Sequence, residues 1–142
     1  MRQKERKNII QHLAGWFTLV FPDVPIESVA LGDEKSLKKI LDKVKITVNV
    51  TPLGMVPHVD ASPLPEELMP KPGTIVYDTN YNPVRTLLLK TAEEAGCKPI
   101  GGLDMLIIQG MESLCWWLKS ELPWREMMDE IRNTLKAALG EK

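Results

Sequence analysis

Two patterns of apolar residues alternate along the chain, one typical of helices and one typical of buried strands. Apolar residues three or four positions apart, with charged residues between them, predict helices. Short β-branched and apolar runs without that spacing predict buried strands. The expected helices span residues 4–17, 33–44, 65–69, 84–95, 103–119 and 123–139. The expected strands span residues 26–31, 45–50, 74–78 and 97–100.

The order of these elements predicts an α/β fold. Strands and helices that alternate with short connections form a parallel sheet with helices on both faces. The first element is nevertheless a helix, and no Gly-x-Gly-x-x-Gly loop joins a strand to a helix. We therefore expect a partial doubly wound parallel sheet of about four strands. It lacks the first strand and the glycine-rich loop, and it ends in C-terminal helices.

Composition and charge narrow the class of protein. A chain of 142 residues has the size of one ordinary domain, and 44% hydrophobic residues can build a core. The formal net charge of −1 argues against a general nucleic-acid or anionic-membrane binder. No apolar run approaches the ~20 residues that span a bilayer, and the charged N-terminus lacks a signal-peptide core. These features predict a cytoplasmic protein.

Cysteine and histidine are too sparse to predict a metal site. Cys97 and Cys115 lack the spacing of metal ligands, so reduced thiols are expected. His12 and His58 are far apart in the sequence and suit structural or surface roles. We therefore expect no metal.

Three short segments hold most of the candidate chemistry. Residues 48–55 (VNVTPLGM) and 76–83 (VYDTNYNP) each run from a buried strand into a loop, and residues 101–110 (GGLDMLIIQG) begin a helix. Ligands of open parallel sheets bind at the carboxyl ends of the strands. The three segments therefore indicate a crevice for a nucleotide or substrate, although each is also compatible with an ordinary turn or helix start.

In their order and spacing, these segments resemble the shikimate dehydrogenase family. The resemblance also includes Thr86-Leu87-Leu88 and Ala95-Gly96, and it is strongest over residues 46–118. It implies NADP-dependent, reversible reduction of 3-dehydroshikimate to shikimate, a step of the chorismate pathway to aromatic amino acids. It also implies that residues 1–142 are a single truncated Rossmann-like NADP-binding domain, whose C-terminal helices are 103–119 and 123–139. The chain resembles only the later part of that domain.

The resemblance assigns roles to individual residues. Tyr81 and Gln109 match substrate-binding positions, and Gly102 and Met105 match positions at the nicotinamide end of the cofactor. Thr51, Pro52 and Thr79 belong to the loops that line the cofactor crevice in the family. Each residue also has a plain structural interpretation: a tight strand exit, an aromatic ring packed on Pro83, a core methionine or a surface glutamine.

Arg2 and Arg6 have the spacing of two arginines that bind the 2′-phosphate of NADP in the family. A guanidinium suits a phosphate, but a charged helix start is the commoner meaning of such a cluster. Asp104 stands where the family most often has Gly. Its carboxylate favours the helix dipole but could crowd or repel the cofactor.

The family's catalytic Lys–Asp pair, Ser-x-Ser motif and glycine loop have no counterpart in this sequence. We therefore expect the chain alone to be inactive, and no catalytic residue is assigned. The alternative function is that of an isolated or truncated non-catalytic domain, a binding or assembly module. The motifs do not separate shikimate from quinate, or NADP from NAD.

The helix expected at residues 103–119 is apolar around almost its whole circumference. Such a helix is normally buried on several sides, and exposed apolar surface tends to find partners. We therefore expect a homo-oligomer, formed through a surface that includes Trp116 or Trp117.

Overall fold

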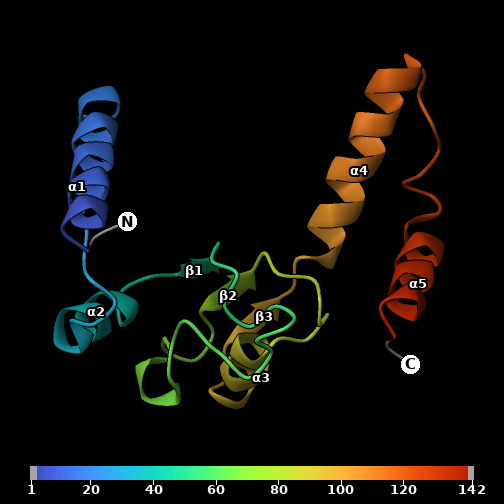
Figure 1. Cartoon of the computed structure of the whole chain (residues 1–142). Coiled ribbons are helices and arrows are strands. Elements are labelled where there is room, and N and C mark those ends of the chain that lie inside the picture. The colour runs from blue at the N-terminus through green and yellow to red at the C-terminus, as the bar shows by residue number, and fades with distance from the viewer. Residues whose placement is uncertain (1–2, 141–142) are drawn as a thin grey trace. The chain divides into compact units, whose positions relative to one another are not determined.

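The structure is a computed structural model that describes residues 3–140, with side chains described from residue 11 onward (Figure 1). The chain divides into two compact units between Leu37 and Lys38. No helix within residues 3–140 is long and apolar enough to cross a membrane. The expectation of a single domain over residues 1–142 stays a prediction.

The first unit consists mainly of helix α1 (Gln3–Val20), which is three residues longer at its C-terminus than the sequence predicts. Trp16 and Phe17 meet edge to face with their ring centroids 5.3 Å apart, and Phe17 stacks on Phe21 at 6.4 Å. These rings remain largely solvent-exposed. The apolar spacing of the sequence therefore predicted the helix correctly but not a buried face.

The strand predicted at residues 26–31 is wrong, because these residues form no strand. An isolated strand is not stable, since its backbone groups need a neighbouring strand for hydrogen bonding. Among the described strands, none pairs with this segment. The described sheet therefore has three strands instead of the expected four.

Helix α2 (Glu34–Leu41) begins where the sequence predicts. The Asp33 side chain accepts a hydrogen bond from the Ser36 backbone N–H at 3.2 Å, which is the geometry of an N-cap. The helix ends three residues before the predicted Val44, and the Lys38 ammonium donates to the Met69 carbonyl at 2.9 Å.

The second unit is built on a parallel sheet, as the sequence predicts. Its strands are β1 (Ile46–Asn49), β2 (Ile75–Asp78) and β3 (Lys98–Ile100), in the spatial order β1-β2-β3. The register pairs Asn49 with Asp78, the last residues of β1 and β2. The loops that follow these two strands therefore leave the sheet at the same edge (Figure 1).

One face of the sheet is buried and the other is open. Val76 and Asp78 are fully buried on one face of β2. Helix α3 (Leu87–Glu94) packs on β2 and β3 and buries Leu88, Leu89 and Ala92. Ile46, Val48 and Ile100 lie on the opposite face and are 55%, 49% and 47% exposed.

Three of the remaining helical segments, α3 (Leu87–Glu94), the short helix expected at 65–69 and the last helix, begin later than the sequence predicts. Thr86 caps α3 by accepting a hydrogen bond from the Leu89 N–H, so the helix begins at Leu87 and not at residue 84. The predicted helix at 65–69 is a single 3-10 turn, η1 (Glu66–Leu68). Turns occupy residues 123–127 and bury Trp124, and α5 (Met128–Ala138) follows them.

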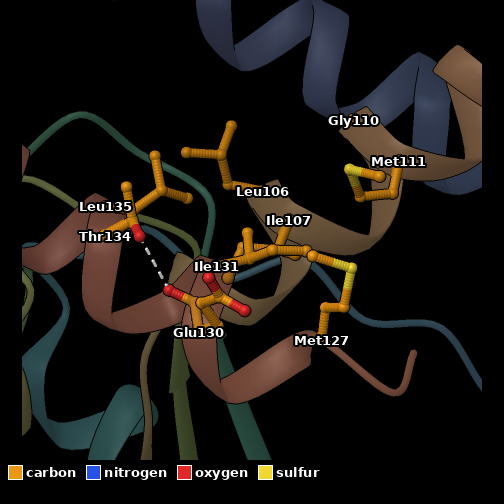
Figure 2. Close-up of a pocket in the computed structure, with 9 residues that line it drawn as sticks. All are labelled: Leu106, Ile107, Gly110, Met111, Met127, Glu130, Ile131, Thr134 and Leu135. Carbon is orange, nitrogen blue, oxygen red and sulfur yellow. Dashed lines mark hydrogen bonds between the residues drawn. The ribbon is translucent and has the colours of Figure 1, made fainter. Parts of the chain in front are cut away.

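Helix α4 (Leu103–Leu118) contacts α5. Arg132 of α5 binds the Asp104 carboxylate of α4 through two hydrogen bonds, Nε to Oδ1 at 2.7 Å and Nη2 to Oδ2 at 3.1 Å. An apolar groove of about 550 Å³ lies between the two helices (Figure 2). It is lined by Leu106, Ile107, Gly110, Met111, Met127, Glu130, Ile131, Thr134 and Leu135.

Candidate strand-end site

The ends of β1 and β2 are joined by a buried polar network around Asp78. The Asp78 carboxylate is fully buried and accepts three hydrogen bonds. Asn49 Nδ2 and the Asn80 backbone N–H donate to Oδ1 at 3.0 and 3.1 Å, and the Thr86 hydroxyl donates to Oδ2 at 2.6 Å. Because a buried carboxylate without partners is costly, these donors are required for the fold.

The loop after β1 is held by the side chain of Asn49. Its Oδ1 accepts hydrogen bonds from the Thr51 backbone N–H at 2.9 Å and the Thr51 hydroxyl at 2.7 Å. Gly54 closes the turn with φ +89°, and a Cβ there would lie 3.0 Å from the Ala61 carbonyl oxygen. The hydrogens of Thr51 are therefore used inside the loop, while Pro52 is exposed at its surface.

Asn80 connects this first loop to the second and third motifs. Its Nδ2 donates to the carbonyl oxygens of Thr51 and Leu53 at 3.1 and 2.9 Å. Its own carbonyl accepts a hydrogen bond from the Gly102 N–H at 3.1 Å. The three segments that the sequence singled out therefore meet at one residue.

Gly102 allows the start of α4 to approach the loop after β2. A Cβ at this position would lie 2.1 Å from the carbonyl oxygen of Thr79, which is inside any allowed contact. Thr79 in turn donates both its N–H, at 3.1 Å, and its hydroxyl, at 3.0 Å, to the Asn49 carbonyl. Thr51, Thr79 and Gly102 are thus brought into one cluster.

The other candidate residues surround this cluster less closely. Tyr81 is half-buried in the loop between β2 and α3. Met105 lies in the first turns of α4 and is 37% exposed, and Gln109 is exposed one turn further along the helix. Arg2 lies outside the described residues, as does the side chain of Arg6 in α1.

Asp104 is engaged by a cation. The hydrogen bonds that Arg132 donates to the Asp104 carboxylate, together with the one that it donates to Asp129, raise the pKa of the Arg132 guanidinium above its ordinary value. The first-turn carboxylate of α4 is therefore neutralised by α5 and does not stand as an isolated charge.

The two cysteines differ in their surroundings. Both are free thiols, and Cys97 is buried whereas Cys115 is half-buried. Burial raises the pKa of the Cys97 thiol, which lies 3.5 Å from the Pro70 carbonyl oxygen. Within the described residues, no three His, Cys, Asp or Glu side chains form a group that could hold a metal ion.

The sequence assigns no role to Asn49, Asp78 or Asn80, although all three lie in segments 48–55 and 76–83. One signal was available, because Asn49 and Asp78 are polar residues that end two buried strands. The partners of Asn80 are 27 and 29 residues away, and sequence spacing does not reveal such pairs.

The parallel sheet and the joined strand-end loops place the chain in the class of Rossmann-like α/β proteins, and the chain corresponds to part of such a fold. Comparison with known proteins makes the class more specific. A shikimate dehydrogenase (NADP(+)) from Gloeothece citriformis is 41% identical over 103 residues, which are 71% of this chain and 36% of that protein. Another, from Thermosynechococcus vestitus, is 35% identical over 136 residues, which are 94% of this chain and 44% of that protein.

Solved structures lead to the same family. The shikimate 5-dehydrogenase of Listeria monocytogenes, in complex with shikimate and NAD, superimposes with a TM-score of 0.66 and 33% identity. The match covers 77% of this chain and 36% of the Listeria chain. No protein-family model matches the chain. Over the matched residues the chain belongs to the shikimate dehydrogenase family, and it spans about a third of the length of the Gloeothece relative, 36%.

Proposed function

We propose that this chain forms one wall of an NADP(H) and shikimate crevice of the shikimate dehydrogenase type. The reaction of the complete site is the reversible reduction of 3-dehydroshikimate by NADPH, in the cytoplasmic synthesis of aromatic amino acids. The observation that carries this proposal is the junction at Asn80, where the three family motifs meet at the carboxyl ends of β1 and β2. That edge of a parallel sheet is where such folds bind ligands.

The cofactor is proposed to lie along the cluster of Thr51, Thr79 and Gly102 and the exposed Pro52 beside Thr51, with Met105 beside the nicotinamide. A thioether offers a soft apolar contact to a flat ring, and Met105 is exposed enough to make one. The N-terminus of α4 leaves backbone N–H groups available for a polar ligand.

The substrate is proposed to bind Tyr81 and Gln109. A phenol hydroxyl and a carboxamide together supply donors and acceptors for the hydroxyl and carboxylate groups of shikimate. Within residues 11–140, neither the Tyr81 hydroxyl nor the Gln109 side-chain amide has a hydrogen bond to another part of the chain. Both are at least partly exposed.

Arg2 and Arg6 are proposed to bind the 2′-phosphate of NADP. The proposal rests on their spacing of four residues, which matches that of the family's two phosphate-binding arginines, and on the suitability of a guanidinium for a phosphate.

We further propose that the chain by itself does not turn over substrate. Proton transfer by a positioned acid or base is typically worth about 10²–10⁴-fold in rate, and the expected Lys–Asp pair is not in this sequence. In this form the chain acts as a binding or assembly module, and its exposed apolar helix surface favours a homo-oligomer.

Calorimetric titration with NADPH tests the cofactor site. We expect measurable binding, weakened about tenfold by Met105→Ala through the loss of apolar contact. Ile108→Ala is the matched control, because Ile108 lies on the same helix and is 45% exposed against 37% for Met105. Absence of NADPH binding, or equal effects of the two substitutions, would contradict the proposed site.

Spectrophotometric assay of shikimate-dependent NADPH formation tests the remainder of the proposal. We expect no turnover from the purified chain. Turnover at ordinary enzyme rates would overturn the claim that this chain is inactive alone.

A further inference from the structure

Asn80 forms hydrogen bonds through its backbone N–H, its backbone carbonyl and its side-chain NH2 group, and these bonds reach different segments. The residue is 6% exposed. Its N–H binds Asp78, its side-chain amide binds the carbonyls of Thr51 and Leu53, and its carbonyl binds Gly102. A single buried side chain and its peptide groups therefore connect β2, the loop after β1 and the start of α4.

The loop after β1 depends strongly on this connection. Residues 51–54 have no regular secondary structure, so no ladder of backbone hydrogen bonds holds them. The Asn49 side chain accepts a hydrogen bond from the N–H of Thr51, and the Asn80 amide donates to the carbonyls of Thr51 and Leu53. Without the Asn80 amide, the Thr51 carbonyl would need another donor, which water can supply, and the Leu53 carbonyl would keep only the contact with Asn49 Nδ2 at 3.5 Å.

Asn80 is itself held in place by hydrogen bonds to the core of the second unit. Its N–H is fixed by Asp78, whose second carboxylate oxygen is bound by the Thr86 hydroxyl at the N-terminus of α3. A buried network with every member satisfied specifies one arrangement of the groups it joins. The position of Asn80 is therefore set by the core of the second unit and not by the loops that it binds.

We propose that Asn80 is a positioning residue. It holds the loop after β1, the loop after β2 and the start of α4 in one arrangement before any ligand binds. The ligand then meets a preformed site and does not have to order the loops, which lowers the cost of binding. The identity of the ligand, NADPH, rests on the function proposed above, whereas the ordering of the loops does not.

Native-state hydrogen exchange tests the ordering directly. Asn80→Asp keeps the shape of the side chain but replaces the amide donor with an oxygen that faces two carbonyls. Asn80→Ala removes the donor without adding charge, and it serves if the Asp variant does not fold. The matched control is Leu88→Ala, because Leu88 is 1% exposed in α3 and its truncation destabilises the core without touching the loops.

The readout is the exchange rate of the Thr51 and Gly102 amides relative to those of Val76 and Tyr77 in β2. We expect this ratio to rise about tenfold in either Asn80 variant, because the loops open locally when their hydrogen bonds are lost. In Leu88→Ala we expect the ratio to change by less than about twofold, since global opening affects all four amides. An unchanged ratio in both Asn80 variants would overturn the inference.

Calorimetry with NADPH tests the consequence for binding. We expect Asn80→Ala to weaken NADPH binding about tenfold and Leu88→Ala to leave it within about twofold, under conditions where all proteins are folded. Equal affinity of Asn80→Ala and the unsubstituted chain would overturn the preformed crevice. If the unsubstituted chain does not bind NADPH, the proposed function fails, and the exchange ratio alone still decides the role of Asn80.

Discussion

The strand-end site is packed so closely that some positions have no room for a larger side chain, and Gly102 is the clearest of these positions. Its N–H binds the Asn80 carbonyl, and its hydrogen faces the Thr79 carbonyl where a Cβ would be 2.1 Å away. The neighbouring atoms are backbone and are held by Asn49 and Asp78, so they cannot move aside easily. Glycine at this position is therefore needed for close approach and not for an unusual φ.

Substitution of Gly102 by alanine should destabilise the protein by about 1–3 kcal/mol, the usual cost of an overpacked site. Gly110→Ala is the control, because its Cβ would meet nothing within 4 Å in the middle of α4. Replacing a helical glycine with alanine should stabilise by about 0.5–1 kcal/mol. Urea denaturation followed by circular dichroism measures both changes, and equal effects would contradict the steric argument.

Helices α4 and α5 are associated through charge and through their apolar sides. The Asp104–Arg132 pair bridges them with two hydrogen bonds, and the apolar groove lies along the same junction (Figure 2). The side chain of Asp104 is 51% exposed, so solvent screens the pair and limits its contribution to stability. The pair therefore contributes more to the alignment of α4 against α5 than to the stability of their packing.

A double-mutant cycle with Asp104→Asn and Arg132→Gln should give a coupling energy of about 0.5–1 kcal/mol. The Arg125–Glu112 pair, whose side chains are 71% and 51% exposed, is the control and should give a smaller coupling. Adding salt to 1 M should reduce the coupling of both pairs. A coupling near zero for Asp104–Arg132 would contradict the alignment role.

At the scale of the whole molecule, the second unit exposes apolar side chains that a parallel α/β fold ordinarily covers. The open face of the sheet carries Ile46, Val48 and Ile100, although parallel sheets are normally covered on both faces. At the end of α4, Trp116 and Trp117 are 77% and 70% exposed, and Leu118 is 57% exposed. Such a group of large apolar side chains is typical of a surface that binds another protein.

Self-association should therefore be detectable by light scattering at high protein concentration. The double substitution Trp116→Ser and Trp117→Ser should weaken it at least about thirtyfold, which corresponds to the roughly 2 kcal/mol of an interface hot spot. Trp16→Ser is the control, because Trp16 is likewise exposed, at 60%, but belongs to α1. A monomeric mass at all concentrations, or equal effects of the two variants, would contradict this interface.

Much of the second unit could be predicted from local patterns. The β-branched run before Asn49 and the glycine-rich start of α4 identified a strand and a helix within one or two residues of their observed bounds. The strand at 26–31 failed because a strand depends on a neighbour, which periodicity does not show. The helix predicted from residue 84 begins at Leu87 because the Thr86 hydroxyl caps it while also binding Asp78.

Local patterns were enough to predict the order of the elements after residue 33, the parallel α/β class and the resemblance to the family, because periodicity and motif spacing are local properties of the chain. Only the tertiary structure showed that the three motifs meet at Asn80 and that Arg132 neutralises Asp104. Asn80 lies 29 and 27 positions from Thr51 and Leu53, and Arg132 lies 28 positions from Asp104. Strand register and helix packing bring such residues together, and both depend on the whole fold. The physical reason is that hydrogen bonds and ion pairs form between neighbours in space, whatever their separation along the chain.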